Sequence, residues 1–279
     1  MDAPPDKEPI GSFLAAATAL SEQGVHVPEI RAYSTEQGFI LMEDLGGVDY
    51  LSVLGESPNE LYEPAIESLV RIQRGRQDQP GLPLPLYNAA HLEMELDVFD
   101  EWYVQKHLET SFTPAQSEIW RDTKAHLIDA SLEQPQVWVH RDYHSRNLMA
   151  CDDRLPGVID FQDLLIGPMA YDVVSLFRDC YIEWPQEHQE RWCEIYLKRA
   201  NHMLDISEVS MDQFMRWYDF TGLQRHLKVL GVFSRLHYRD GKSQYLNDIP
   251  LVRKYVSDAL EQHPELDEFR TLFDELPHA

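Results

Sequence analysis

The chain has 279 residues, of which 48 are acidic and 24 basic, so its formal net charge is −24. A surface of this sign repels nucleic acid and anionic membranes, and we expect neither as a partner. The three cysteines form no CxxC pair, no leader-like segment opens the chain and no apolar run approaches membrane length, which favours a cytoplasmic protein.

The first elements predicted along the chain form a small unit. A helix over residues 11–23 is followed by Gly24, a residue type that commonly ends helices. Two short extended runs come next, at 29–34 and 38–42, separated by a turn. We therefore predict a first domain over residues 1–46, made of one helix and two strands.

The remainder, residues 47–279, is predicted to be mostly helical. The expected helices begin at capping sequences or carry an apolar stripe, and they start near Ser57, Asn88, Thr113 and Ser210. The helix from Asn88 is expected to run to His107. Short β-type runs interrupt this pattern, and they lie at residues 136–140, 147–150 and 158–161.

Chemistry-bearing residues follow these β-type runs. The sequence His140-Arg141-Asp142 is followed, after four residues, by Asn147. Thirteen residues after Asn147, Asp160 stands at the end of a β-type run and precedes Phe161. This order and spacing match the catalytic loop and metal-binding aspartate of kinases. We therefore predict phosphoryl transfer, with residues 140–147 as the catalytic loop.

Each of these residue types suits a separate task in that reaction. Mg²⁺ prefers oxygen ligands and neutralises the charge of nucleotide phosphates, so Asp160 and Asn147 are predicted to hold Mg²⁺. Asp142 is then left to orient the attacking hydroxyl and to accept its proton. An alternative is metal-dependent hydrolysis with His140, Asp142 and His144 as ligands, although it gives no role to Asn147 or Asp160.

The same motifs resemble those of the aminoglycoside phosphotransferase and choline kinase group. Within that group the sequence is most similar to bacterial kinases that phosphorylate the anomeric hydroxyl of N-acetylmuramate and N-acetylglucosamine. The resemblance extends from residue 1 to about 260 and is carried by residues 41–46, 140–149, 159–163, 167–172 and 222–228.

The resemblance implies a fold and several roles. The fold is α+β, a two-lobe protein-kinase-like fold with the hinge between lobes at residues 43–46. Main-chain groups of Glu43 and Leu45 would bind the adenine of ATP, the co-substrate. Asp172 would brace the catalytic loop. Kinases of the sugar-specific branch act in peptidoglycan recycling.

The chain departs from the family pattern at its start. Residues 1–5 resemble the end of the third strand of the small lobe, and the chain contains no G-x-G-x-x-G loop. Lys7 is the nearest lysine, and it fits a surface position better than a phosphate-pairing one. The resemblance therefore implies a truncated small lobe, weak or absent activity, and an exposed strand edge available for self-association.

Residues near the predicted base are candidates for substrate binding. Arg141 or Arg146 would bind the carboxylate of N-acetylmuramate in a two-pronged way, although either arginine would equally brace a nearby carboxylate. His144 would contact the substrate or cap the loop. Glu95 lies off the apolar stripe of its helix, which borders the acceptor pocket in similar enzymes, or else it faces solvent.

The sequence leads to one function and two alternatives. The first is ATP-dependent phosphorylation of the anomeric hydroxyl of an amino sugar. An aminoglycoside or choline-type kinase is the nearest enzymatic alternative, but its cationic substrates would favour a carboxylate-lined pocket over the arginines near Asp142. The other alternative is an inactive binding module that keeps the fold and lacks the phosphate-clamping parts.

Overall fold

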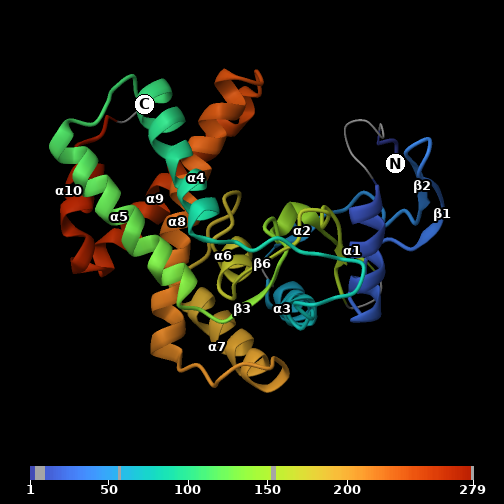
Figure 1. Cartoon of the computed structure of the whole chain (residues 1–279). Coiled ribbons are helices and arrows are strands. Elements are labelled where there is room, and N and C mark those ends of the chain that lie inside the picture. The colour runs from blue at the N-terminus through green and yellow to red at the C-terminus, as the bar shows by residue number, and fades with distance from the viewer. Residues whose placement is uncertain (4–9, 56–57, 152–154, 278–279) are drawn as a thin grey trace. The chain divides into compact units, whose positions relative to one another are not determined.

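A computed structural model describes residues 1–3, 10–55, 58–151 and 155–277, and the chain divides into two compact units (Figure 1). The first unit consists of Met1–Leu86, Gln136–Asp179 and Trp184–Met211. The second consists of Tyr87–Pro135, Cys180–Glu183 and Asp212–Ala279. The lobe boundary predicted after residue 46 falls inside the first unit and stays a prediction.

The N-terminal part of the first unit has the predicted helix and two strands. Helix α1 (Gly11–Glu22) precedes strands β1 (Ile30–Ser34) and β2 (Phe39–Met42), which pair antiparallel beside it in Figure 1. Gly24 follows α1 with φ of 76°, a conformation in which glycine avoids the steric cost that a Cβ would bring. The helix and both strands are confirmed.

The first residues of the chain extend this hairpin. Asp2 forms an antiparallel bridge with Phe39, and the main chains of Met1 and Ile40 exchange hydrogen bonds of 2.9 and 3.1 Å. Residues 1–3 therefore lie along β2 as a strand-like segment. Lys7 falls among residues 4–9, outside the described part of the chain.

Other helices of the first unit follow the hairpin in the chain. They are α2 (Tyr50–Val53), α3 (Asn59–Gln73), α6 (Tyr171–Phe177) and α7 (Gln186–Met203). Trp192 of α7 packs edge-on against Tyr62 of α3, with ring centroids 4.4 Å apart, and its indole nitrogen donates to Asn59. The predicted start of helix α3, at Ser57, lies outside the described residues.

Two small antiparallel sheets lie in the segment that precedes α6. Strand β3 (Gln136–Val139) pairs with β6 (Leu165–Pro168), and β4 (Leu148–Met149) pairs with β5 (Gly157–Val158). The predicted run at 158–161 is therefore only partly correct. Asp160 has φ of 63°, which is incompatible with a strand, so the strand ends before it. Strand β6 was not predicted.

The second unit is helical in its described residues. Its longer helices are α4 (Ala89–Val98), α5 (Pro114–Leu132), α8 (Met211–Tyr238), α9 (Ile249–Gln262) and α10 (Asp267–Glu275), with short 3₁₀ turns at Ser243–Asp248 and Pro264–Leu266. Helix α5 begins with the predicted capping box, in which Thr113 and Gln116 bond each other's main-chain amides.

The helix predicted over 88–107 changes type partway. From Phe99 to His107 it continues as a π-helix, a form that is rare at this length. Gly231 of α8 lies against the junction, where an added Cβ would stand 2.3 Å from the carbonyl oxygen of Val98. The close backbone approach at Gly231 coincides with the point where the turn widens.

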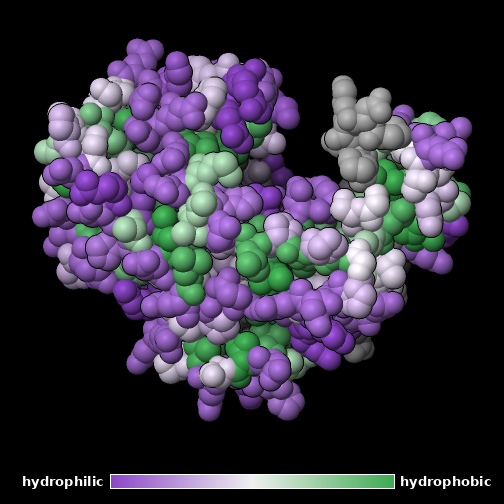
Figure 2. Space-filling model, in the orientation of Figure 1, coloured by the Kyte–Doolittle hydropathy of each residue, from purple (hydrophilic) through white to green (hydrophobic). Residues whose placement is uncertain are grey.

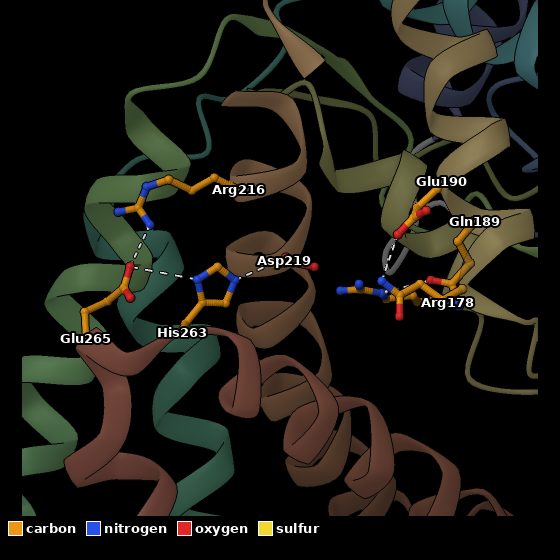
Figure 3. A network of polar contacts seen from close by, with 8 residues as sticks. Arg178, Gln189, Glu190, Arg216, Asp219, His263 and Glu265 are labelled. Atoms are coloured by element: carbon orange, nitrogen blue, oxygen red, sulfur yellow. Dashed lines mark hydrogen bonds and ion pairs between the residues drawn. The ribbon is translucent and has the colours of Figure 1, made fainter. Parts of the chain in front are cut away.

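A polar network ties the turn after α9 to helix α8. His263 lies between two carboxylates, with Nε2 3.1 Å from Asp219 and Nδ1 3.8 Å from Glu265 (Figure 3). Arg216 completes the network with an ion pair of 3.0 Å to Glu265. These contacts fix the start of the C-terminal helices on α8 within the second unit.

Hydrophilic residues cover most of the face drawn in Figure 2, and hydrophobic residues gather there in smaller patches. Among the described residues, no helix has both the length and the apolar character that crossing a membrane requires.

Candidate active site

The predicted catalytic loop leaves β3 and is held at its start by a buried carboxylate. Asp172, in the first turn of α6, is fully buried. Its two oxygens accept hydrogen bonds from the main-chain amides of His140, at 2.6 Å, and Arg141, at 3.0 Å. Asp172 therefore braces the loop, as the resemblance implied.

Two residues at the site have a left-handed backbone. Arg141 has φ of 78° and Asp160 has φ of 63°. Such values are uncommon for residues other than glycine and persist where the surroundings compensate for the strain. At Arg141 the compensation includes the bond from its amide to Asp172. Strain of this kind concentrates at functional sites.

Asn147 brings the three predicted residues together. Its side-chain nitrogen donates to the main-chain carbonyl oxygen of Asp142, at 2.9 Å, and lies 3.4 Å from Oδ2 of Asp160. The pairing of β4 with β5 contributes, because the amide of Ile159 donates to the carbonyl of Asn147 at 3.2 Å. Residues that are 18 positions apart therefore meet at one place.

A cavity of about 720 Å³ opens beside this meeting point. Asn147 and Asp160 line it, together with Gln162 and Asp163. Its apolar wall comes mainly from the N-terminal part of the chain: Met1, Ala3, Ile10, Phe13, Pro28, Met42, Ile159 and Phe161. Asp142 is exposed but is not among the lining residues. The cavity is thus apolar over much of its wall and acidic at one end.

The donor set at that acidic end fits a magnesium ion. Oδ1 of Asp160 accepts a hydrogen bond of 2.7 Å from Gln162, and no lysine or arginine among the described residues pairs with this carboxylate. The nitrogen of the Asn147 amide makes the contacts with Asp142 and Asp160, so its oxygen takes part in neither of them. A carboxylate and an amide oxygen are ligands that Mg²⁺ accepts. Gln162 had no predicted role.

His140 is a structural residue of the loop. It is 1% exposed, and burial lowers its pKa to about 4, although the carboxylates of Asp142 and Asp160 oppose the shift. The neutral ring therefore donates through Nε2 to the carbonyl oxygen of Ile159, at 3.0 Å. This bond links the catalytic loop to the segment that carries Asp160.

The alternative of metal-dependent hydrolysis does not fit this geometry. It needs His140, Asp142 and His144 as a ligand cluster. In the described part of the chain, no three histidine, cysteine or acidic side chains are grouped so as to hold a metal ion. The Nε2 atom of His140 is already engaged by Ile159. That interpretation is therefore wrong.

The predicted hinge lies next to the cavity wall. Met42 lines the cavity, whereas Glu43 and Leu45 do not. The amide of Glu43 donates to Glu29, at 2.9 Å. Toward other described residues, neither the carbonyl of Glu43 nor the amide of Leu45 forms a main-chain hydrogen bond. The nucleotide-binding roles of Glu43 and Leu45 stay predictions.

The candidates for substrate binding lie in both units. Arg141 and His144 are half-buried on the loop, and Arg146 is exposed in the 3₁₀ turn Ser145–Asn147. Glu95 belongs to the second unit and is 7% exposed, so it does not lie on a solvated helix face. The contribution of all four residues to substrate binding stays a prediction.

The carboxylate of Glu95 is occupied within its own unit. Lys228 forms an ion pair with it at 2.8 Å, Tyr87 donates to it, and Gln224 lies 3.4 Å away. A buried carboxylate with this many donors is satisfied. The cluster joins α4 to α8.

The fold and site define a phosphotransferase of the protein-kinase-like class. A short loop at the end of a strand carries Asp142 and Asn147, and the next strand pair brings Asp160 to them. Residues 1–211, more than half of the chain, match the phosphotransferase enzyme family APH, and the chain belongs to this family.

Curated proteins with a more specific name are similar to nearly the whole chain. A protein of Pseudomonas putida named N-acetylmuramate/N-acetylglucosamine kinase is 42% identical over 277 residues, which cover 99% of this chain and 80% of the relative. The protein of the same name from Neisseria meningitidis is 39% identical, over 99% of this chain and 82% of the relative.

Solved structures agree on the fold. A choline/ethanolamine kinase family protein from Mesorhizobium loti matches with a TM-score of 0.63 and 13% identity, over 95% of this chain and 83% of the other. ADP-bound aminoglycoside phosphotransferase APH(2'')-Ib matches with a TM-score of 0.58 and 13% identity, over 89% and 82%. At this level of identity the likeness concerns the fold alone.

Proposed function

We propose that this protein is a cytoplasmic ATP-dependent kinase of amino sugars, which phosphorylates the anomeric hydroxyl of N-acetylmuramate or N-acetylglucosamine in cell-wall recycling. The observation that carries the proposal is the meeting of Asp142, Asn147 and Asp160 through the Asn147 side chain, beside an acidic-ended cavity. The substrate class is supported by relatives about 40% identical over nearly the whole chain.

Asp142 is the proposed base. The acceptor oxygen forms a bond to the γ-phosphorus of ATP, the bond from that phosphorus to the β,γ-bridging oxygen breaks, and the hydroxyl proton passes to the carboxylate of Asp142. The products are a sugar phosphate and ADP. An anomeric hydroxyl is more acidic than an ordinary alcohol, so a carboxylate suffices as base. Catalysis then consists mainly of positioning and charge neutralisation.

Asn147 and Asp160 are the proposed magnesium ligands. The ion, when bound, would neutralise charge on the nucleotide phosphates. Two features of the chain support these ligands: the unpaired charge of Asp160 within the described residues, and the Asn147 amide oxygen, which takes part in neither contact of that side chain with Asp142 and Asp160. Both residues line the cavity, so a nucleotide bound there would bring its phosphates to them.

The adenine is proposed to bind at the hinge. Its exocyclic amine would donate to the carbonyl of Glu43, and a ring nitrogen would accept from the amide of Leu45. Two observations support this: these groups form no main-chain hydrogen bond with other described residues, and the adjacent Met42 lines the apolar wall. An apolar wall with a few main-chain polar groups is typical of cofactor sites.

The acceptor is proposed to contact the catalytic loop. Arg141 or Arg146 would bind the carboxylate that N-acetylmuramate has and N-acetylglucosamine lacks, because a guanidinium pairs with a carboxylate through two hydrogen bonds. Substitution of the binding arginine by Gln would then lower activity toward N-acetylmuramate and leave activity toward N-acetylglucosamine unchanged. His144 and Glu95 are further candidates for contacts with the sugar.

A phosphorylation screen tests the proposal. Purified protein is incubated with ATP, Mg²⁺ and a panel containing both amino sugars, an aminoglycoside and choline, and the products are assigned by ³¹P NMR. We expect sugar 1-phosphates from the amino sugars. Reaction with the aminoglycoside or choline alone would refute the amino-sugar assignment, and a 6-phosphate product would refute the anomeric position.

The rate is a separate prediction. This chain contains no G-x-G-x-x-G loop, and we expect turnover to be low for that reason. Calorimetric titration with Mg²⁺ and a non-hydrolysable ATP analogue shows whether the nucleotide binds, and a product assay then separates a slow enzyme from a binding module. A slow enzyme binds the nucleotide and forms product over hours, whereas an inactive module forms none at any enzyme concentration.

A further inference from the structure

A second buried carboxylate grips the catalytic loop at its far end. Oδ2 of Asp179 accepts a hydrogen bond of 3.0 Å from the main-chain amide of Ser145 and another of 2.5 Å from its hydroxyl. Asp179 and Ser145 are both completely buried. One carboxylate oxygen therefore takes both donors of a single loop residue, away from solvent.

Asp179 comes from the same short segment as Asp172. Helix α6 begins at Tyr171 and ends at Phe177, so Asp172 lies in its first turn and Asp179 two residues beyond its end. Asp172 binds the amides of His140 and Arg141, whereas Asp179 binds Ser145. The loop is thus held near both ends by carboxylates from one short segment, α6 and the residues that follow it, with Asp142 between the two attachment points.

The backbone around Asp179 is itself anchored. Its neighbour Arg178 donates through Nε to the side-chain oxygen of Gln189 on α7, at 3.1 Å, and the two side chains lie together in Figure 3. A buried carboxylate costs free energy unless donors satisfy it, and charge-assisted bonds to an amide and a hydroxyl are strong. Asp179 is therefore a fixed point to which the loop is attached.

The contact between Asp179 and Ser145 is linked to Asn147, the proposed magnesium ligand, through neighbouring residues of the loop. Ser145 begins the 3₁₀ turn that ends at Asn147, and the amide of Asn147 donates to the carbonyl of His144, at 2.9 Å. The side chain of Asn147 in turn holds the carbonyl of Asp142. A displacement of Ser145 would therefore move Asn147, and with it the position of Asp142.

We propose that Asp179 is a positioning residue for phosphoryl transfer, which acts through Ser145 to set the place of Asn147. The proposal rests on the proposed function, because it assigns a kinetic consequence to a contact within the loop. Asp179 is completely buried and does not line the cavity. Its effect is on geometry, and so it falls on turnover and on cation affinity more than on sugar affinity.

The test compares Asp179→Asn and Ser145→Ala with a matched control. Ser175→Ala removes another completely buried hydroxyl of the same region, which donates to the carbonyl of Tyr171 within α6. We expect kcat to fall about 10- to 100-fold in Asp179→Asn and about 3- to 10-fold in Ser145→Ala, because misplacement of a catalytic group is costly. The KM for the sugar should stay within about 2-fold.

A double variant and a binding measurement complete the test. Because both changes break one contact, the double variant should lose no more activity than Asp179→Asn alone. Titration with Mn²⁺, followed by its paramagnetic resonance signal in the presence of a non-hydrolysable ATP analogue, should show weaker cation binding in both single variants. Excess Mg²⁺ should then restore part of kcat, which a general loss of folding would not allow.

The outcomes separate this proposal from the proposed function. If the kcat and the Mn²⁺ affinity of Ser145→Ala equal those of Ser175→Ala, the positioning role of Asp179 is wrong. This comparison decides the question even if Asp179→Asn fails to fold. If no acceptor is phosphorylated by the unchanged protein, the proposed function fails. Weaker Mn²⁺ binding in Ser145→Ala would in that case still support the attachment of Asn147 through Asp179.

Discussion

The side chain of Asn147 donates a hydrogen bond of 2.9 Å to the main-chain carbonyl oxygen of Asp142. This bond closes the loop from Asp142 to Asn147 and places the proposed base and a proposed magnesium ligand in fixed relation. It also decides the direction of the Asn147 amide, because the nitrogen that binds Asp142 leaves the oxygen pointing elsewhere. One side chain therefore performs two tasks, and substitutions can separate them.

Asn147→Asp should separate the two roles of this side chain, which are to hold the main chain of Asp142 and to bind the cation. The variant keeps an oxygen for the cation but lacks the donor that holds Asp142, whereas Asn147→Ala lacks both. We expect kcat to fall about 10- to 100-fold in Asn147→Asp with the Mg²⁺ requirement little changed, since a misplaced group is costly. Asn147→Ala should in addition need about 10-fold more Mg²⁺. Steady-state kinetics against Mg²⁺ concentration measures both effects.

Equal Mg²⁺ requirements in Asn147→Ala and the unchanged protein would remove Asn147 from the ligand set. Asn201→Ala is a suitable control. That asparagine also bonds the main chain through its side chain, at Val209, and it does not line the cavity.

Asp142→Asn should abolish most of the turnover without weakening nucleotide binding. The amide cannot accept the hydroxyl proton, and general base catalysis contributes about 10²- to 10⁴-fold. We therefore expect a loss of kcat in that range. The affinity for a non-hydrolysable ATP analogue, measured by calorimetry, should be unchanged within about 2-fold.

Asp78→Asn removes a carboxylate that forms an exposed ion pair with Arg76 and serves as the control for Asp142. Retention of kcat in Asp142→Asn would show that another group takes the proton.

The sequence predicts the site well where the determinants are local. Spacing along the chain is enough to place Asp142 and Asn147 on one loop and Asp160 after the next strand. Gln162 and Asp179 were missed because their roles depend on the direction of a side chain and on a contact between residues 34 positions apart. No local pattern encodes either feature.

The fold, too, could be predicted where its determinants are local in the sequence. Helix α1 and the β1–β2 hairpin have local signals and were found. Strand β6 contains Gly167 and Pro168, which are typical of turns, and it forms only because β3 pairs with it. The change to a π-helix at Phe99 accompanies the approach of Gly231, a tertiary effect that the apolar stripe does not reveal.

Gln162→Leu should weaken cation binding. Gln162 donates to Oδ1 of Asp160 at 2.7 Å, so it restricts the carboxylate to the orientation in which Oδ2 faces Asn147. Leucine keeps much of the volume and removes the donor. We expect about 3- to 10-fold more Mg²⁺ to be needed for half-maximal activity, a loss typical of residues that orient a metal ligand.

Gln186→Leu provides the comparison for Gln162. Gln186 makes a similar bond of 2.8 Å to an exposed carboxylate, that of Glu190, and it does not line the cavity. If both leucine variants have the Mg²⁺ requirement of the unchanged protein, Gln162 has no part in orienting Asp160.

His140 should make the folded state sensitive to acid. Its pKa is about 4 in the folded protein, because burial disfavours the charged ring, and about 6.5 when the chain is unfolded. Between these values the unfolded state binds a proton that the folded state does not, so stability is full above pH 6.5 and falls as the pH drops toward 4. The loss at pH 4 amounts to ~3 kcal/mol.

His140→Gln removes this titration while keeping a side-chain N–H that can bond the carbonyl of Ile159. The free energy of unfolding, measured by urea denaturation at several pH values, should therefore fall less steeply below pH 6.5 in the variant. At pH 7 the unchanged protein should be the more stable, and the difference should shrink by ~3 kcal/mol at pH 4. Parallel curves for the two proteins would mean that His140 has the same pKa in the folded and the unfolded state, and the expected sensitivity to acid would then be wrong.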